Sequence, residues 1–227
     1  FEQAADHAAA AFAVPEAIAL CDQAIEARDR SGAKSAPRKI AKLYEKKAEL
    51  LVAVSDFRGA FEAYEQEAKL GHELANPLLE GSALAGMGLA ALFLHDFEAS
   101  LALSVRTIKI GSDLESPELQ AAGQWNQGFV QAVTARLDES RASFEAAHGL
   151  GEAANSPFHQ GLAGSFLALL DSWAGNYRAA ETASRAAGAV VREAELVWPM
   201  MFTQWSRGLV LTAMGAHDPA FESFESA

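Results

Sequence analysis

Four prolines recur along this chain at one constant interval of forty positions: Pro37, Pro77, Pro117 and Pro157. Two further series keep the same interval, one of large apolar residues and one of glycines: Phe57, Phe97, Leu137 and Tyr177, and Gly71, Gly111 and Gly151. Self-similarity at a period of this size is typical of arrays in which helical hairpins stack and each covers its neighbour's apolar face. The interval therefore restricts the chain to a helical-repeat architecture.

Within each repeat, the pattern predicts two helices joined by a short polar turn. In the second helix of the 37–76 repeat, Phe57, Phe61, Tyr64 and Ala68 recur at intervals of three and four, which is the spacing of one face of a helix. The turn before it contains Asp56, a residue type that caps helix N-termini. Each proline marks the start of a new helix. In the 117–156 repeat, we expect the joint at Arg136-Leu137-Asp138.

The resulting prediction is an all-α fold, a right-handed superhelix of stacked helical hairpins forming one solenoid domain over residues 1–227. The hairpins are expected at residues 1–36, 37–76, 77–116, 117–156 and 157–197, with an incomplete one at 198–227. In the first hairpin we expect a helix over residues 1–13 and a loop over 31–36. This loop places the first hairpin about three residues out of the register of the later repeats. Since the chain lacks an initial Met and stops within a helical pattern, we expect it to be a fragment of a larger protein.

A glycine occupies the same position in three of the first helices: Gly88, Gly128 and Gly208. Because Gly inside a helix costs about 1 kcal/mol relative to Ala, the series predicts that a neighbouring helix approaches closely there.

Charge and composition exclude several functions. The formal net charge is −12, which disfavours binding to nucleic acid or to anionic lipid. One basic stretch runs from Lys34 to Lys47 and is interpreted as a solvated helix face, with a docking patch for an acidic segment as the alternative. The single cysteine, Cys21, excludes an intrachain disulfide and fits a cytoplasmic location. The sequence contains neither an apolar run of membrane-spanning length nor a signal peptide.

Motifs for catalysis are missing or out of context. Gly149-Leu150-Gly151-Glu152-Ala153-Ala154 matches a dinucleotide-binding pattern, but the pattern requires a preceding strand and here it ends a predicted helix. The six histidines show no i, i+4 pairing that would predict a metal site. We therefore expect no enzymatic activity, no cofactor and no metal.

The best candidate for a binding surface is a polar stripe on the first helix of the 117–156 repeat. Gln120, Gln124, Gln127, Gln131 and Thr134 are spaced by four, three, four and three residues, which places them on one side of a helix. The same positions are partly polar in the later repeats, at Asp171, Gln204 and Arg207. Large aromatic residues stand near the stripe in sequence: Trp125, Phe129, Trp173, Phe202 and Trp205.

Two interpretations of this pattern stay open. In the first, the glutamines face water and the aromatic residues pack between helices. In the second, a concave groove with aromatic walls and a few amide groups binds a partner. The candidate binding residues are then Gln124, Trp125, Gln127, Phe129, Gln131, Trp173, Gln204, Trp205 and Arg207.

The repeats resemble the tetratricopeptide repeat (TPR). The unit starting at Pro117 has Gly128 in its first helix, Leu137 at the joint, Ser140 and Phe144 early in the second helix, and Pro157 at its end. The forty-residue period is longer than that of the usual TPR, which is about 34 residues. That long form resembles the arrays of bacterial LuxR-type activators, STAND ATPases and ATPase-coupled cyclases.

The resemblance implies a non-catalytic module of a bacterial signalling protein. Such a module binds a partner protein, peptide or small inducer and passes the event to an attached catalytic or DNA-binding domain outside this sequence. A free-standing scaffold is the alternative. Because both ends have apolar faces without polar capping repeats, self-association through them is a further expectation.

Overall fold

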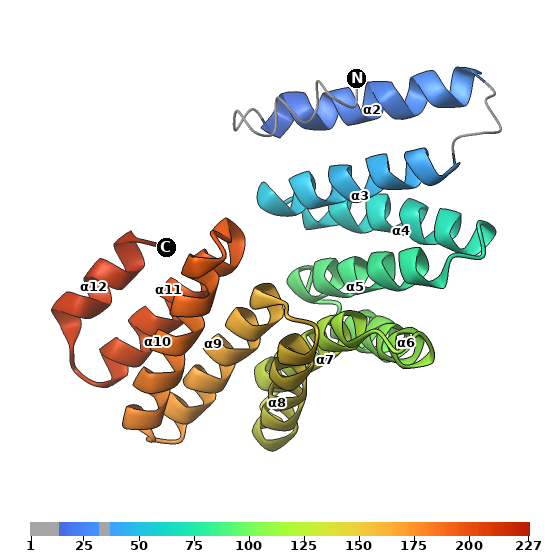
Figure 1. The fold of residues 1–227 in the computed structure, drawn as a ribbon. Coiled ribbons are helices and arrows are strands. Elements are labelled where there is room, and N and C mark those ends of the chain that lie inside the picture. The colour runs from blue at the N-terminus through green and yellow to red at the C-terminus, as the bar shows by residue number, and fades with distance from the viewer. Residues whose placement is uncertain (1–13, 32–36) are drawn as a thin grey trace. The chain divides into compact units, whose positions relative to one another are not determined.

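The computed structural model describes residues 14–31 and 37–227, and throughout these ranges the regular elements are helices (Figure 1). They are α2 (Val14–Ser31), α3 (Pro37–Ala53), α4 (Phe57–Glu73), α5 (Pro77–Phe93), α6 (Phe97–Asp113), α7 (Pro117–Val133), α8 (Leu137–Ala153), α9 (Pro157–Trp173), α10 (Tyr177–Glu193), α11 (Val197–Ala213) and α12 (His217–Glu225). The predicted all-α fold of stacked hairpins is confirmed. The helix expected over 1–13 and most of the loop expected over 31–36 lie outside the described residues.

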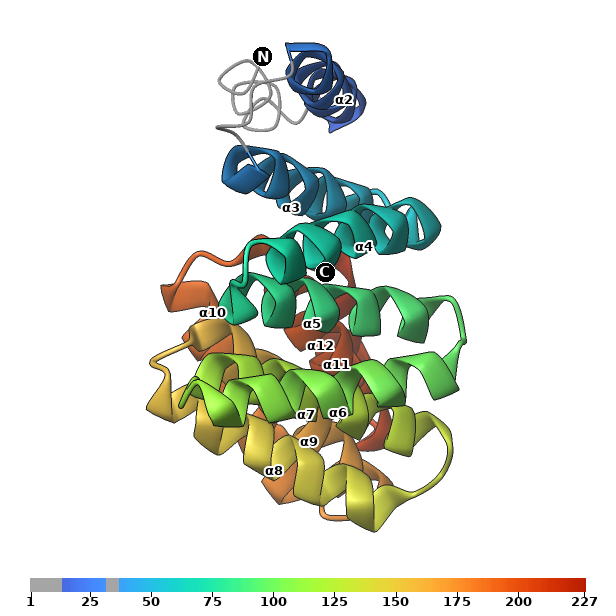
Figure 2. The same cartoon turned by 90° about the vertical axis from the view of Figure 1, so that its right-hand side faces the viewer.

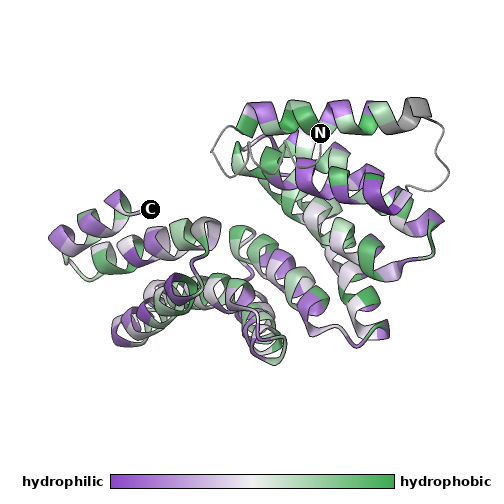
Figure 3. Cartoon of the chain, turned by 45° about the horizontal axis from the view of Figure 1, so that its top comes forward, coloured by the Kyte–Doolittle hydropathy of each residue, from purple (hydrophilic) through white to green (hydrophobic). Residues whose placement is uncertain are grey.

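The chain forms two compact units, Phe1–Ile110 and Gly111–Ala227, with the boundary inside α6. In unit 1, α3, α4 and α5 lie beside one another in chain order (Figure 2). In unit 2, α7 pairs with α8, α9 with α10 and α11 with α12, while α9 also contacts α7 and α11. Hydrophobic and hydrophilic residues alternate along most helices (Figure 3), as expected for helices with one buried face. The single domain over 1–227 stays a prediction.

The turns explain why the repeat keeps its length. The helices from α3 to α11 all have the same length, 17 residues, and three residues separate each from the next. The middle residue of each turn has a positive φ: Ser55, Ala75, His95, Glu115, Ala135, Asn155, Gly175, Glu195 and Gly215. Each turn thus ends its helix with the same left-handed step, and the constant interval between helix starts follows from repeating it.

The glycine series at the ends of the second helices has a packing reason. A Cβ added to Gly71 would lie 2.6 Å from the backbone nitrogen of Glu80, in the first turn of the next helix. The same clash would arise between Gly151 and the nitrogen of Gln160, at 3.0 Å. Since no side chain fits there, glycine lets one hairpin lie directly against the following one.

Small shifts separate the predicted from the observed boundaries. The joint expected at Arg136-Leu137-Asp138 lies at Thr134–Arg136, and α8 already begins at Leu137. The last hairpin begins with Val197 instead of residue 198, and Pro199 lies within the first turn of α11, where proline is tolerated. The offset of the opening helix is confirmed, because the step from the start of α2 to the start of α3 is three positions longer than each later step.

Candidate functional site

Both ends of the polar stripe of α7 contact second helices. At its start, the Gln120 side-chain amide donates to the carbonyl of Gly111, at 3.3 Å. Near its end, Gln131 is 4% exposed, and its Oε1 accepts a hydrogen bond of 2.7 Å from Ser143 of α8. Gln124 and Gln127 between them are half-buried. The two ends of the stripe are therefore engaged in helix packing.

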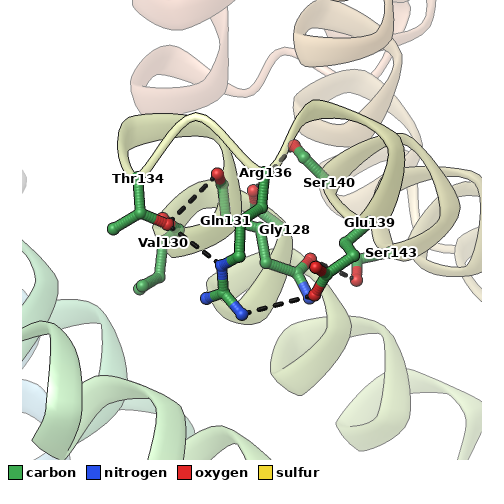
Figure 4. Close-up of polar contacts among 8 residues, drawn as sticks. All are labelled: Gly128, Val130, Gln131, Thr134, Arg136, Glu139, Ser140 and Ser143. Carbon is green, nitrogen blue, oxygen red and sulfur yellow. Dashed lines mark hydrogen bonds and ion pairs between the residues drawn. The ribbon is translucent and has the colours of Figure 1, made fainter.

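Figure 4 shows the network that surrounds Gln131 at the turn between α7 and α8. Its Nε2 lies 3.5 Å from Oε2 of Glu139, which also pairs with Arg136 at 3.3 Å. Arg136 in turn donates to the hydroxyl of Thr134, at 3.2 Å. Two of the predicted stripe residues, Gln131 and Thr134, are thus engaged in holding a hairpin together.

The later members of the stripe also meet second helices. Asp171 of α9 accepts a hydrogen bond of 2.7 Å from Arg141 of α8. Oε1 of Gln204 in α11 accepts one of 3.2 Å from the hydroxyl of Ser223 in α12. Arg207 is half-buried, and its Nε is buried without a hydrogen-bond partner among the described residues.

The aromatic residues lie on the other side of the same helices. Residues two apart on a helix are separated by about 200°, so they point to opposite sides. Each predicted aromatic residue stands two positions from a member of the stripe. Trp125 and Phe129 flank Gln127, Trp173 follows Asp171, Phe202 precedes Gln204, and Trp205 precedes Arg207. The two sets thus point in different directions on each helix, and the groove that combines amides and aromatic walls stays a prediction.

Trp125 belongs to the core, which corrects its predicted place in a binding wall. It is 3% exposed, and its ring packs at centroid distances of 5.6 Å from Phe129 and 5.7 Å from Phe166. Phe166 stacks at 5.0 Å on Phe144 of α8, which is fully buried. This cluster joins α7, α8 and α9, and its half-buried member Phe129 gives it a partly accessible edge.

A second aromatic cluster is accessible to solvent. Phe158 at the start of α9 stacks on Trp198 of α11 at 5.7 Å and 9°, and Trp198 contacts Phe202 at 4.7 Å. One turn further along α11, Trp205 is 42% exposed. We call Phe158, Trp198, Phe202 and Trp205, together with Trp173 at the other end of α9, the aromatic face. Trp173 is 57% exposed.

The helices that carry the aromatic face are nearly uncharged. Their ionisable residues are His159 and Asp171 on α9 and Arg207 on α11. Burial lowers the pKa of His159 to about 4, so the ring is neutral at neutral pH. Asp171 is paired with Arg141. The aromatic face can therefore contribute apolar and π contacts but little charge.

Sequence reasoning left Phe158 and Trp198 out of the candidate residues. A signal existed, because the two occupy equivalent positions one repeat apart, each the second residue of its helix. That they stack on each other depends on the lateral packing of α9 against α11, which a helical pattern does not specify.

The dinucleotide-like glycines, Gly149 and Gly151, lie inside the last turns of α8, and the segment that leads to them is that helix and not a strand. In the part of the chain that the structure describes, no cluster of three or more His, Cys, Asp or Glu side chains is arranged to hold a metal ion. Nor does any helix there have the length and apolar character to span a membrane.

Comparisons with known proteins define the class by its fold. No protein-family model matches the chain, and no curated protein matches its sequence. A Rap protein, solved in complex with Competence and Sporulation Factor, has a TM-score of 0.78 at 15% identity, over 99% of this chain and 62% of the Rap chain. BtubC from P. vanneervenii has a TM-score of 0.68 at 15% identity, over 94% of this chain and 89% of BtubC.

A P. anserina protein described as a kinesin light chain with nearly identical TPR-like repeats has a TM-score of 0.55 at 14% identity, over 85% of this chain and 94% of its own. The protein is thus similar in fold to TPR-like helical-repeat solenoids.

Proposed function

We propose that this chain is a non-catalytic interaction module that binds an apolar segment of a partner protein or peptide on the aromatic face of α9 and α11. The observation that carries the proposal is the exposure of Trp173 and Trp205 on two neighbouring helices that are almost free of charge. Large aromatic residues supply much of the binding energy at protein interfaces when they are available to a partner. Exposed apolar clusters of this kind indicate interaction sites.

The geometry suggests the size of the segment. Phe158 and Trp173 lie at opposite ends of α9, a separation of about 22 Å along the helix axis. An extended peptide of roughly seven residues spans that length. We therefore propose an extended segment of about this length whose side chains include at least one aromatic or branched apolar residue near each end.

The structural neighbours support a binding role without specifying the ligand. One chain of similar fold was solved in complex with Competence and Sporulation Factor, so this architecture can hold a partner. A small inducer stays an alternative occupant, and thermal shifts across a panel of metabolites and peptides would distinguish the two, because a ligand at about 100 times its Kd adds roughly 2.7 kcal/mol of stability.

The test is a screen of extended seven-residue peptides by fluorescence anisotropy, followed by titration of the best binder against single variants. Trp205→Ala and Trp173→Ala are expected to weaken binding at least tenfold each while leaving the circular dichroism spectrum unchanged. Because the face has little charge, the affinity should change less than twofold between roughly 50 mM and 500 mM salt.

A matched control is Val105→Ala in α6, which removes another exposed apolar side chain, 60% accessible, that does not belong to α9 or α11. It should bind as the unmodified protein does. Equal affinity of Trp205→Ala, Trp173→Ala and Val105→Ala for the selected peptide would rule out the aromatic face as its site.

The proposal for the wider context rests on the repeat length and the alanine-rich style of the helices. The resemblance to long TPR arrays suggests a bacterial signalling protein in which the module is attached to a catalytic or DNA-binding domain, and a free-standing scaffold is the alternative. The coding sequence on either side of this segment distinguishes the two. A neighbouring domain with an ATPase, cyclase or DNA-binding signature supports the first, and its absence supports the second.

A further inference from the structure

One packing position of the second helices holds a carboxyl group in α4 and smaller groups in the later repeats. Its members, one per repeat, are Glu67, Thr107, Ala147 and Ala187. All four are buried, and Glu67 is 0% exposed. A side chain that normally requires hydration therefore replaces a methyl or hydroxyl group in the core.

Glu67 lies in the middle of the buried stripe of α4, in which its companions are Ala60, Ala63 and Gly71. Ala60 and Ala63 belong to the core cluster that α4 forms with α3 and with Ala90 of α5, and α4 lies between these two helices (Figure 2). Neither carboxylate oxygen of Glu67 has a hydrogen-bond partner within the described residues. The group is thus held by packing alone.

The charged groups that raise the pKa of Glu67 carry its own sign. Glu45 and Glu49 of α3 act on it through space, and burial followed by these two charges raises the pKa of Glu67 to about 8. Tyr64, one turn earlier on α4, has its pKa raised in turn by burial and by Glu49, Glu67 and Glu45. The positive charge of Lys46 acts in the opposite direction, but the pKa that it lowers is that of Glu49.

The other neighbouring helices do not supply a counter-charge. Glu80 is the one ionisable residue of α5, and it is paired with Arg106 of α6 at 3.3 Å and with His72 at 3.5 Å. Arg106 is thereby engaged with Glu80.

We propose that Glu67 makes the packing of α4 against α3 and α5 responsive to pH, keeping unit 1 closed while the carboxyl group is protonated and loosening it once the group ionises. An ionised Glu67 would face two carboxylates without a hydrogen-bond donor. It gains hydration only if α4 moves away from its neighbours, because the side chain is 0% exposed between them.

The direction of the effect follows from proton linkage. The pKa of Glu67 is raised from its ordinary value of 4.5 to about 8 in the folded protein, so the folded state binds the proton more tightly than the unfolded state. The stability of unit 1 should therefore be fully present below about pH 4.5 and decline as the pH rises towards 8. Across pH 5 to 8, the equilibrium constant for opening should increase on the order of 100-fold.

Hydrogen exchange of the full chain, read by mass spectrometry and corrected for intrinsic rates, tests this directly. Between pH 5 and 8, amides of α3, α4 and α5 should lose protection on the order of 100-fold. Glu67→Gln, which keeps the shape without the charge, should remove the dependence, as should Glu67→Ala, which restores the residue of the equivalent position. Glu62→Gln, on the exposed side of α4, should behave like the unmodified protein.

A carbon NMR titration of the Glu67 carboxyl group, assigned by its loss in Glu67→Gln, gives an independent measurement. An ordinary titration near pH 4.5 would contradict the proposal. So would parallel pH profiles of exchange in Glu67→Gln and the unmodified chain.

Discussion

The ring of Phe144 lies directly against the backbone of Gly128. A Cβ built on Gly128 would be 3.0 Å from both Cδ1 and Cε1 of that ring, and Ser140 donates a hydrogen bond of 2.8 Å to the Gly128 carbonyl. This is the close helix approach that the glycine series predicted. In the last hairpin, Gly208 meets Phe224 in the same way, with its nearest atom at 2.4 Å from the built Cβ.

Gly128→Ala should lower the free energy of unfolding by about 1 kcal/mol, because an overpacking cost of about 1–3 kcal/mol exceeds the gain of about 1 kcal/mol in helix propensity. Phe144 cannot give way easily, since it is fully buried and stacks on Phe166. Gly128→Leu should cost about 3 kcal/mol. Urea denaturation followed by circular dichroism measures both variants.

Gly149→Ala is the matched control for this pair. Gly149 lies inside α8 with no atom within 4 Å of a built Cβ, so only the propensity gain remains, and stability should rise by about 1 kcal/mol. If Gly128→Ala and Gly149→Ala changed stability in the same direction, the contact with Phe144 would not be the controlling factor.

Truncation should destabilise the protein strongly at Trp125 and very little at Trp205. Trp125→Ala removes a side chain that is 3% exposed and should lower the free energy of unfolding by about 3–5 kcal/mol. Trp205→Ala, at 42% exposure, should change it by roughly 0.5 kcal/mol or less. Circular dichroism is the suitable probe, because each variant alters the fluorescence. Similar losses in both variants would contradict the assignment of Trp125 to the core and Trp205 to the accessible face.

The turn residues predict a reciprocal pair of substitutions. Ala135 has φ 60° and Gly175 has φ 80° at equivalent positions. A left-handed conformation costs a residue with a Cβ about 1–2 kcal/mol, from which the entropy advantage of Ala in the unfolded chain, about 0.4–1 kcal/mol, is subtracted. Ala135→Gly should therefore raise the melting temperature, and Gly175→Ala should lower the free energy of unfolding by about 1 kcal/mol. If both substitutions changed the stability in the same direction, the two turns would not be equivalent.

Unit 2 should lose stability in acid through His159. The side chain is 8% exposed, its Nδ1 lies 3.0 Å from the hydroxyl of Ser156, and burial lowers its pKa from 6.5 to about 4. The folded state then binds the proton less tightly, so stability is complete above about pH 6.5 and falls as the pH drops towards 4, by about 3 kcal/mol in total.

Tryptophan fluorescence during urea denaturation measures this, since all four tryptophans lie in unit 2, at Trp125, Trp173, Trp198 and Trp205. His159→Gln should flatten the pH profile between 4 and 6.5. His217→Gln, on the exposed start of α12, is the control and should keep the slope of the unmodified chain.

Much of the fold could be predicted because its signals are local. The interval between prolines and the three- and four-residue spacing of apolar side chains determine where each helix begins and ends. The boundary at Pro199 was missed by one residue because proline fits the first turn of a helix as well as its first position. The repeat position of Glu67, shared with Ala147 and Ala187, places it on the apolar side of its helix. That both of its carboxylate oxygens lack a hydrogen-bond partner among the described residues is decided only by the packing of the neighbouring helices.

What the sequence by itself determined is the repeat: all-α, with each turn and helix in register, because these depend on neighbours within a few positions along the chain. Only the tertiary structure decided which side of each helix meets which neighbour. The spacing of Gln124, Gln127 and Gln131 shows that they share a side of α7. That Gln131 meets Ser143 of α8, and that Trp198 meets Phe158, depends on how the hairpins pack against one another. Helical spacing specifies the direction in which each side chain points around the axis of its own helix. Whether that side chain is buried depends on where a neighbouring helix lies.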